Sequence, residues 1–493
     1  MHRFRFSASG GPVASRAPRL AASLATLALL LTLLLPAAQS WATDRDPFVC
    51  PWEGRASGHV REFSLSVGQV QWEIAPGRVV QTYAYNGQIP GPELRVAEGD
   101  TVRVTVTNTL SQPTTIHWHG IDLPVGMDGT PDFSQQPIAP GGSFTYEFVA
   151  TPAGTRWYHS HVDELVQHGG GLYGPLIVEP RDAAAPPPDR EYTLLMGELA
   201  TLPANAQGSQ PSTIRERDTS GHAGHGRMAA LSLPTVNGFV VNGKAYPAAA
   251  PLSVTRGQRV RLRLINAGLA GTQKLALAGH HFTLTHSDGN PLAAPVEAEA
   301  VLLGPGERAD VEFTADNPGR WQLRSLTPGQ AAAGLMTEVV YTGHEADPVQ
   351  GFAPGAEPQP ASYRQFGGPA HRGTPDRTYQ ITLTYSMNDG AYTFNGKAYP
   401  DAEAIQAQVG QRVRVRILNM NLEDHPIHLH GHSFQVVGIE DQPVDGPIKD
   451  TLTLHHGEQY DIEFVANNPG TWLLHCHNVL HMAAGMMTEV HYQ

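Results

Sequence analysis

The sequence predicts an all-β protein made of three consecutive β-sandwich or β-barrel domains. The chain has 493 residues, which is too many for one hydrophobic core and suits two to four domains. Its 51 glycines and 40 prolines favour short strands joined by many turns. In addition, a series of segments recurs three times along the chain, with apolar and polar side chains alternating as in a half-buried strand.

The repeated unit begins with an alternating strand and closes on a segment that contains Glu-Phe. In each copy a glycine leads into the strand and an asparagine ends it, at residues 99–108, 257–266 and 410–419. The closing segments, each followed by a tryptophan and then by Gly-Leu or Gly-Met, are residues 146–149, 311–314 and 462–465. Repeats of more than about a hundred residues are duplicated domains and not solenoid units.

We place the three domains at residues 55–182, 190–345 and 376–493. The segments between them, 183–188 and 344–375, are rich in proline with alanine or with glycine and glutamine, a composition typical of linkers. Short strands with frequent turn residues predict a sandwich or a barrel in each domain.

The first 42 residues have the features of a secretory signal peptide. Four arginines precede an apolar run from about residue 21 to residue 35, and the segment ends in Ala-Gln-Ser-Trp-Ala. The run is too short to span a bilayer comfortably, although an uncleaved membrane anchor is the alternative. We therefore expect an exported protein, periplasmic or secreted, without stable membrane insertion once the signal is removed.

The net charge and the cysteine content exclude several classes of protein. With 33 basic and 46 acidic residues, the formal charge of -13 makes the chain a poor candidate for binding nucleic acid or an anionic membrane. Cys50 and Cys476 are the only cysteines in the sequence, so no disulfide framework supports the fold. Cys50 is expected to be an unpaired bystander, with an intermolecular disulfide as the alternative.

The segment 472–487 carries the residues of a copper site. Cys476, His481 and Met486 have the spacing C-x4-H-x4-M, which supplies the thiolate, the imidazole and the weak thioether of a blue-copper electron-transfer centre. A second histidine must arrive from elsewhere. His475 and His477 flank the cysteine, and in an extended segment they point to the face opposite Cys476. One strand would then join two metal sites back to back.

Four His-x-His pairs provide ligands for the second metal site. Two pairs lie in the first domain and two in the third: His117 with His119, His159 with His161, His428 with His430, and His475 with His477. Domain two lacks such a pair although it keeps every strand signal, so the fold does not require them. The eight imidazoles suit a cluster of copper ions at the interface of domains one and three, with domain two as a spacer. His425 is free to complete the site of Cys476.

These motifs, in this order, resemble those of the multicopper oxidases, the laccase-like three-domain cupredoxin oxidases, over nearly all of the predicted mature chain. The resemblance implies three cupredoxin-like Greek-key β-sandwich domains with one type 1 copper, one type 2 copper and a type 3 pair. The implied type 1 ligands are His425, Cys476, His481 and axial Met486, and the type 2 ligands are His117 and His428. The implied type 3 ligands are His119, His159 and His477 on one ion, and His161, His430 and His475 on the other.

The resemblance also implies a reaction. Small reductants give up one electron at a time, whereas reducing dioxygen to water takes four, and the bonded path from Cys476 to His475 and His477 would connect the two steps. Protons must also arrive: Asp128, nine residues after His119, matches a family carboxylate near the type 2 copper, with an ordinary turn residue as the alternative. Relatives often carry a second carboxylate where this chain has Met482, so the sequence does not support that second route.

Other candidates have weaker patterns. Glu423 and Asp424 precede His425 and are positioned to contact a reductant, although a turn before a strand also favours acidic residues. The segment 221–228, with His222 and His225, either holds a labile copper ion or forms a solvated loop, which we favour. Met487 aligns with Met336 of the ligand-free domain and is expected in the core. We expect structural or surface roles for the remaining histidines that we considered: His168, His280, His281, His432, His455 and His456.

The sequence leaves three functions open. A laccase-like oxidase of phenols and aromatic amines is favoured. A cuprous-ion oxidase for copper tolerance uses the same chemistry with another donor, but the Met-rich insert typical of such enzymes is missing from a chain with 10 methionines. A non-enzymatic copper-binding or scaffold protein of the same fold is disfavoured because every motif ligand is present. Comparing Cu(I) with a phenol as donor separates the first two.

Overall fold

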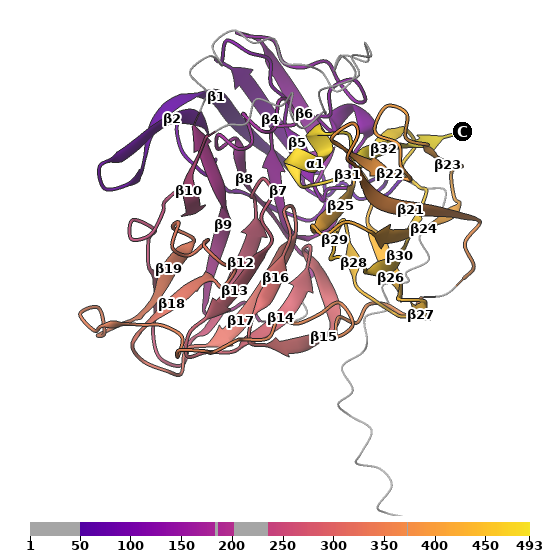
Figure 1. The fold of residues 1–493 in the computed structure, drawn as a ribbon. Coiled ribbons are helices and arrows are strands. Elements are labelled where there is room, and N and C mark those ends of the chain that lie inside the picture. Colours follow the sequence, from indigo (N-terminus) through magenta and orange to yellow (C-terminus); the bar gives the residue numbers. More distant parts are fainter. Residues whose placement is uncertain (1–49, 183–185, 202–234, 372) are drawn as a thin grey trace, which may run out of the picture. The chain divides into compact units, whose positions relative to one another are not determined.

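The computed structural model describes residues 50–182, 186–201, 235–371 and 373–493 (Figure 1). These residues belong to one compact unit. The predicted signal peptide and the segment with His222 and His225 lie outside the described residues. Within the described part, no helix has the length and apolarity needed to cross a membrane.

Almost all regular structure in the described residues is β-strand, arranged as three pairs of sheets that we refer to as domains one, two and three. In domain one the first sheet has the order β2 (Arg78–Tyr85), β1 (Val60–Ala75), β4 (Thr101–Asn108), β6 (Ser143–Val149). The second sheet has the order β3 (Leu94–Ala97), β8 (Tyr173–Glu179), β7 (Gly154–His159), β5 (His117–His119). A short 3-10 helix, η1 (Val125–Met127), follows β5.

Domain two has the same arrangement of two sheets, but each sheet contains more strands. Its first sheet has the order β10 (Thr235–Val241), β9 (Arg190–Thr201), β12 (Arg259–Asn266), β17 (Arg308–Thr314), β14 (Phe282–Ser287), β15 (Asn290–Ala298). Its second sheet has the order β11 (Leu252–Val254), β19 (Met336–Tyr341), β18 (Arg320–Ser325), β13 (Gln273–Leu277), β16 (Val301–Leu303), and β20 (Val349–Gln350) pairs with β18.

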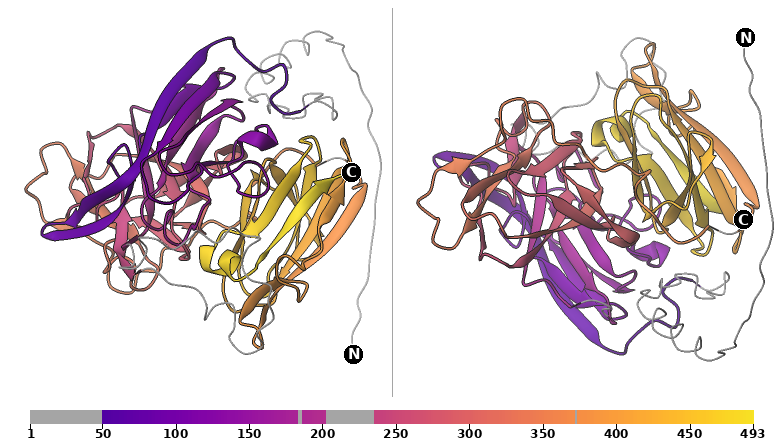
Figure 2. Two further views of the ribbon diagram at one scale, coloured as in Figure 1. Left: turned by 90° about the horizontal axis from the view of Figure 1, so that it is seen from above. Right: turned by 90° about the horizontal axis from the view of Figure 1, so that it is seen from below.

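Domain three has two sheets that lie face to face, in orange and yellow in Figure 2. The first has the order β22 (Ala391–Phe394), β21 (Arg377–Ser386), β24 (Arg412–Asn419), β30 (Gln459–Val465), β26 (Phe434–Ile439), β27 (Gln442–Pro443), with β28 (Ile448–Lys449) against β26. The second has the order β23 (Ile405–Ala407), β32 (Met487–Tyr492), β31 (Thr471–Cys476), β25 (His425–Leu429), β29 (Thr451–Leu454). The α-helix α1 (Val479–Ala483) follows β31.

The alternating strands found in the sequence form the middle of each first sheet. In β4 and β24 every second side chain is buried, because one face of a strand in a sandwich covers the core and the other faces out. In all three domains this strand pairs in parallel with the strand that opens the domain. The predicted all-β sandwich architecture is thus confirmed.

The stretch 344–375 differs from the loose linker that its composition predicts. Phe366 is buried in the core of domain two, and Tyr363 packs against the cores on both sides. The Tyr363 hydroxyl donates a hydrogen bond to Glu307. Aromatic side chains therefore pack this segment against the domain cores, although its proline and glycine content is typical of a loose linker.

Candidate metal centres

Strand pairing brings the four His-x-His pairs of domains one and three together. Within domain one β5 pairs with β7, so that His117 stands opposite His159. Within domain three β25 pairs with β31, so that His428 stands opposite His475. Extended strands project alternate side chains to one face, so both members of a pair can point to the same place.

The pooled imidazoles form groups that cross from domain one to domain three. Ligand atoms lie within 4.8 Å of one another in one group within domain one and in two groups that include both domains: His117, His119 and His159; His117, His428 and His430; and His161, His430 and His475. The last set equals one of the two type 3 ligand sets implied by the motifs. His477 joins the first set through ring contacts, with centroid separations of 5.0 Å to His119 and 5.3 Å to His159. All eight imidazoles are buried.

Hydrogen bonds decide which nitrogen each imidazole can offer to a metal. Nδ1 of His117 lies 2.9 Å from the carbonyl oxygen of Asp128, and Nδ1 of His428 lies 2.9 Å from that of Asp450. Because a carbonyl oxygen only accepts, these Nδ1 atoms carry the proton, and the lone pair is on Nε2. The two Nε2 atoms face each other at 3.4 Å.

The same reasoning applies to the second group. Nδ1 of His430 lies 2.9 Å from a carboxylate oxygen of Asp128, and Nδ1 of His475 lies 3.0 Å from the carbonyl oxygen of Cys476. Their Nε2 atoms are 3.0 Å apart. Two lone pairs at this separation repel each other unless a cation lies between them, so the arrangement fits a metal ion bound by neutral imidazoles.

A smaller group lies on the other face of β31. Nδ1 of His425 is 3.0 Å from Nδ1 of His481, and the two atoms are 3.5 Å and 3.7 Å from Sγ of Cys476. Burial lowers the pKa of His425 to about 3, so that imidazole is neutral and able to bind a metal. The Cys476 N–H donates to the carbonyl oxygen of Met486, which brings the backbone of the predicted axial ligand beside the cysteine.

Local structure fixes the position of His481. Asn478 is the N-cap of α1, and its side-chain oxygen accepts hydrogen bonds from the backbone N–H groups of Leu480 and His481. The first turn of the helix then directs His481 back toward Cys476. Two imidazoles, a thiol and a neighbouring methionine are the donor set of a blue-copper site.

Comparisons with known proteins identify the family of this chain. Profiles described as multicopper oxidase match residues 66–183, 209–342 and 373–493. The chain is 35% identical over 435 residues to the multicopper oxidase MmcO of Mycobacterium tuberculosis, covering 84% of each chain. The chain belongs to the multicopper oxidase family.

Two further similarities are to a protein named for copper resistance and to a laccase. It is 28% identical to a copper resistance protein A homolog of Pseudomonas syringae pv. tomato, over 87% of this chain and 92% of that one. Its fold matches the crystal structure of a laccase from Botrytis aclada with a TM-score of 0.71 and 27% identity, over 88% of each chain. The family and the solved laccase structure agree with the predicted cupredoxin-like sandwich domains. Multicopper oxidases are oxidoreductases that bind copper.

Asp128 follows η1 and lies among the cluster histidines of this multicopper oxidase. Besides His430, its carboxylate lies 3.2 Å from Nδ1 of His117, and it accepts a hydrogen bond from Thr130. Burial acts to raise the pKa of Asp128, but the neighbouring His430 and His117 hold the pKa well below its ordinary value. Asp128 therefore orients two histidines, which is more than an ordinary turn residue does.

Sequence reasoning missed two further carboxylates beside the cluster. Glu164 Oε1 lies 2.9 Å from Nδ1 of His161, and Asp450 Oδ1 lies 3.0 Å from Nε2 of His119. Both carboxylates are buried. The acidic residue three positions after His161 was a detectable signal, because a turn of chain can bring it back onto the imidazole. Asp450 is far from His119 in the sequence and carried no such signal.

Glu423 and Asp424, the two acidic residues before His425, make different contacts. The Glu423 carboxylate lies 3.1 Å from Nε2 of His481, accepts a hydrogen bond from Tyr392, and is more than half exposed. Asp424 instead accepts a hydrogen bond from Thr272 of domain two and lies 2.7 Å from Nδ1 of His455. Of the two, only Glu423 combines exposure with contact to a candidate ligand.

The remaining candidates have packing roles in the described structure. Met487 and Met482 are buried in one apolar cluster with Leu473 and Val479. His280 of domain two and His432 of domain three each contact a tyrosine hydroxyl through Nε2, at 2.6 Å and 2.5 Å. Further histidines of this kind also have hydrogen-bond or ring contacts: His168, His455 and His456. Cys50 and Cys476 are both free thiols.

Proposed function

We propose that this multicopper oxidase couples one-electron oxidation of phenolic or aromatic amine donors at a type 1 copper to the four-electron reduction of dioxygen to water at a trinuclear copper cluster. The observation that carries the proposal is the position of Cys476 between two groups of donors. Its Sγ belongs to the group with His425 and His481, while the adjacent His475 belongs to the group with His161 and His430. Electrons can thus pass between the groups through bonded atoms.

The ligand sets follow the motifs and are supported by the nitrogen positions. The type 1 copper would be held by two Nδ1 atoms, the thiolate and a thioether: His425, His481, Cys476 and Met486. The type 2 copper takes Nε2 of His117 and His428. The type 3 ions take His119, His159 and His477, and His161, His430 and His475.

Copper supplies one-electron transfer at the first site and the electrons for dioxygen reduction at the second. The chain supplies orientation and protons. Asp128 holds Nδ1–H of His430, so that Nε2 points into the cluster, and it is the buried carboxylate that we assign to proton delivery. Glu423, exposed beside His481, is the group that we assign to accepting a hydrogen bond from a phenol or an aromatic amine.

The stoichiometry of the reaction tests the proposal. Dioxygen uptake and donor oxidation are measured together, with a sensitive assay for hydrogen peroxide. We expect four one-electron donor equivalents for each dioxygen and no peroxide. A ratio of two with stoichiometric peroxide would refute water as the product.

A cuprous-ion oxidase is the second candidate, supported by the relationship to a protein named copper resistance protein A homolog. Steady-state kcat/KM for Cu(I) and for a phenol, measured under the same conditions, separates the candidates. We expect the phenol to be the better donor, and a much larger value for Cu(I) would favour the second candidate. A non-enzymatic role conflicts with the presence of every motif ligand in the sequence.

We also propose that the protein is exported and acts in the periplasm or outside the cell. The support is the arginine-rich start, the short apolar run and the small residues that end at residue 42. Cell fractionation with N-terminal sequencing of the mature protein tests this, and a mature protein that begins at Met1 would contradict it.

A further inference from the structure

A loop of domain two reaches the histidines of the cluster, although domain two supplies no ligand. The loop, residues 304–307, joins β16 to β17. Gly306 has a φ of +88°, and a Cβ atom on it would lie 3.0 Å from the His477 ring and 3.2 Å from Cε1 of His119. The loop backbone therefore packs against two imidazoles that we assign to the same type 3 ion.

Arg308, the first residue of β17 directly after this loop, contacts all three domains. Its Nη1 and Nη2 atoms donate hydrogen bonds of 2.6 Å each to the two carboxylate oxygens of Asp450 in domain three. Its Nε donates to the carbonyl oxygen of Thr155 in domain one, at 3.1 Å. Arg308 and Asp450 are both buried, so the paired geometry is shielded from water and strongly directional.

Asp450, held by Arg308, also contacts the candidate copper ligand His119. Its Oδ1 lies 3.0 Å from Nε2 of His119, and because a carboxylate oxygen accepts, Nε2 carries the proton. Nδ1 of His119 has no hydrogen-bond partner among the described residues. His119 is thus turned so that Nδ1 is its free lone pair, whereas the other cluster histidines with an assigned proton offer Nε2.

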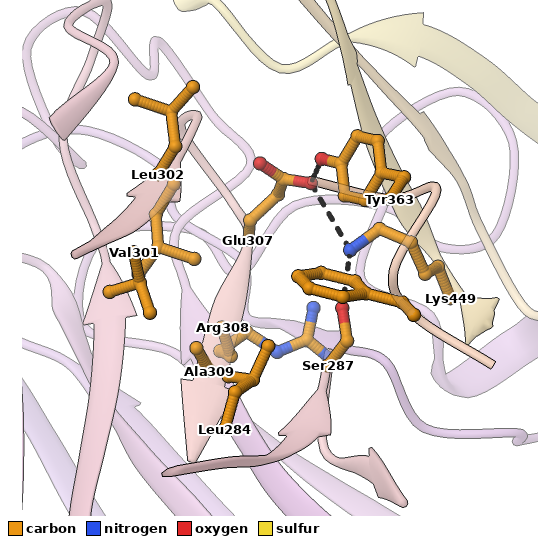
Figure 3. Close-up of a pocket in the computed structure, with 11 residues that line it drawn as sticks. Leu284, Ser287, Val301, Leu302, Glu307, Arg308, Ala309, Tyr363 and Lys449 are labelled. Atoms are coloured by element: carbon orange, nitrogen blue, oxygen red, sulfur yellow. Dashed lines mark hydrogen bonds and ion pairs between the residues drawn. The ribbon is translucent and has the colours of Figure 1, made fainter. Parts of the chain in front are cut away.

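The other side of the loop is fastened to domain three. Figure 3 shows Glu307 and Lys449 pointing toward one another, with a separation of 3.2 Å between Glu307 Oε1 and Lys449 Nζ. Lys449 also donates to Ser287 Oγ at 2.8 Å, and the Tyr363 hydroxyl donates to Glu307. Lys449 directly precedes Asp450, so these contacts hold the carboxylate in front of Arg308.

We infer that Arg308 is a positioning residue for the type 3 copper pair. It fixes Asp450, and Asp450 fixes the proton and the orientation of His119, so that domain two shapes the cluster without touching copper. The inference rests on the proposed function, because it takes His119 as a type 3 ligand. Burial acts to raise the pKa of Asp450, but Arg308 offsets this and holds the pKa below its ordinary value, consistent with a charged acceptor.

The test is the copper affinity of the Arg308→Lys variant. Lysine keeps the charge but cannot form the two parallel hydrogen bonds of a guanidinium. Changing a partner of a metal-bound histidine typically weakens metal binding by about 10- to 100-fold. We expect type 3 copper to leave at chelator concentrations lower by about that factor. Copper content and electron paramagnetic resonance, in which a coupled pair is silent, follow the loss, and the blue type 1 band stays.

Arg263→Lys is the matched control. Arg263 is also a buried arginine of domain two, with Asp310 at 3.0 Å and Glu191 at 2.9 Å, but neither partner contacts a candidate ligand. We expect this variant to hold type 3 copper like the parent. Equal loss from both variants, or no loss from Arg308→Lys, would overturn the inference.

Asp450→Asn gives an independent reading should Arg308→Lys fail to fold, which a missing blue band would reveal. It should weaken the same copper, and the double variant should lose no more affinity than the more damaging single change, because both act through one contact. Parental type 3 affinity in Asp450→Asn would overturn the inference. A parent protein without a blue band would instead refute the proposed function, whereas a blue parent with unaffected variants refutes the inference alone.

Discussion

Domains two and three share the same backbone arrangement around one position, but only domain three places candidate copper ligands there. Ser325 pairs with Leu275 across its sheet as Cys476 pairs with Ile427. The backbone N–H of Ser325 donates to the carbonyl oxygen of Leu335, as that of Cys476 does to Met486. The counterparts, with domain three first, are His425 and Gln273, Cys476 and Ser325, His481 and Gln330, and Met486 and Leu335.

In domain two, the polar side chains at this position form hydrogen bonds with neighbouring side chains. The Ser325 hydroxyl donates to Gln330 Oε1 at 2.7 Å, and the Gln273 amide donates to Asn266 Oδ1 at 2.8 Å. Domain one has a similar hydrogen bond, in which the Ser160 hydroxyl donates to Gln167 Oε1 at 2.8 Å. The backbone around Ser325 and Cys476 therefore has the same arrangement with or without metal-binding side chains. The donors, and not the fold, decide where copper can bind.

The largest expected effect comes from making domain three resemble domain two at one atom. Cys476→Ser replaces the thiolate by a hydroxyl, a poor ligand for copper at this site. We expect the variant to lose the blue charge-transfer band and all oxidation of donors, measured by absorption and by dioxygen uptake. A serine variant that stays blue would show that the type 1 site lies elsewhere.

The next effect concerns the cluster, for which domain two has no counterpart. Asp128→Asn keeps the shape of the side chain but replaces the ionised carboxylate, which can take up a proton and pass it on, by an amide that cannot. General acid catalysis typically contributes about 10²- to 10⁴-fold, so reoxidation of the reduced enzyme by dioxygen should slow by a factor in that range. Stopped-flow reoxidation is compared with reduction by donor, which should keep its parental rate. Reoxidation at the parental rate, with full copper content, would remove Asp128 from the proton route.

A third change copies the domain-two residue at the axial position. Met486→Leu should keep copper and raise the type 1 reduction potential, because loss of the weak thioether destabilises the oxidised ion more than the reduced one. Met487→Leu is the control, since Met487 is buried in the apolar cluster and corresponds to Met336. Redox titration of the blue band measures both. A shift in Met487→Leu alone would mean that the alignment of the domains is wrong.

The smallest effect on activity is expected in domain two. Ser325→Ala removes the donor to Gln330 and leaves a buried amide oxygen unsatisfied, which costs about 1–3 kcal/mol in the free energy of unfolding. Chemical denaturation measures the loss. Copper content and turnover should equal those of the parent, and a change in either would give this position of domain two a role in copper binding that the comparison denies.

The sequence predicted the fold and the candidate ligands because both have local signals. Alternating strands such as β24 and the motif around Cys476 are read within a few residues, and the ligand-free repeat served as an internal control. The carboxylates Glu164 and Asp450, and Arg308 of domain two, were missed. Glu164 lies three residues from His161 and had a local signal, whereas the importance of Asp450 and Arg308 depends on which distant side chain they touch, and only the packed structure brings Asp450 to His119. The packing of residues 344–375 was missed for the same reason.

The most direct test of the central claim is anomalous scattering at the copper edge from crystals of the copper-loaded protein. The account predicts a peak among Nδ1 of His425, Nδ1 of His481 and Sγ of Cys476, and a group of peaks among the eight histidines between domains one and three. It predicts none beside Ser325 and Gln330. Copper beside Ser325 and Gln330, or no copper beside Cys476, would contradict the central claim. That claim is that the donor side chains alone decide which of the repeated domains binds copper.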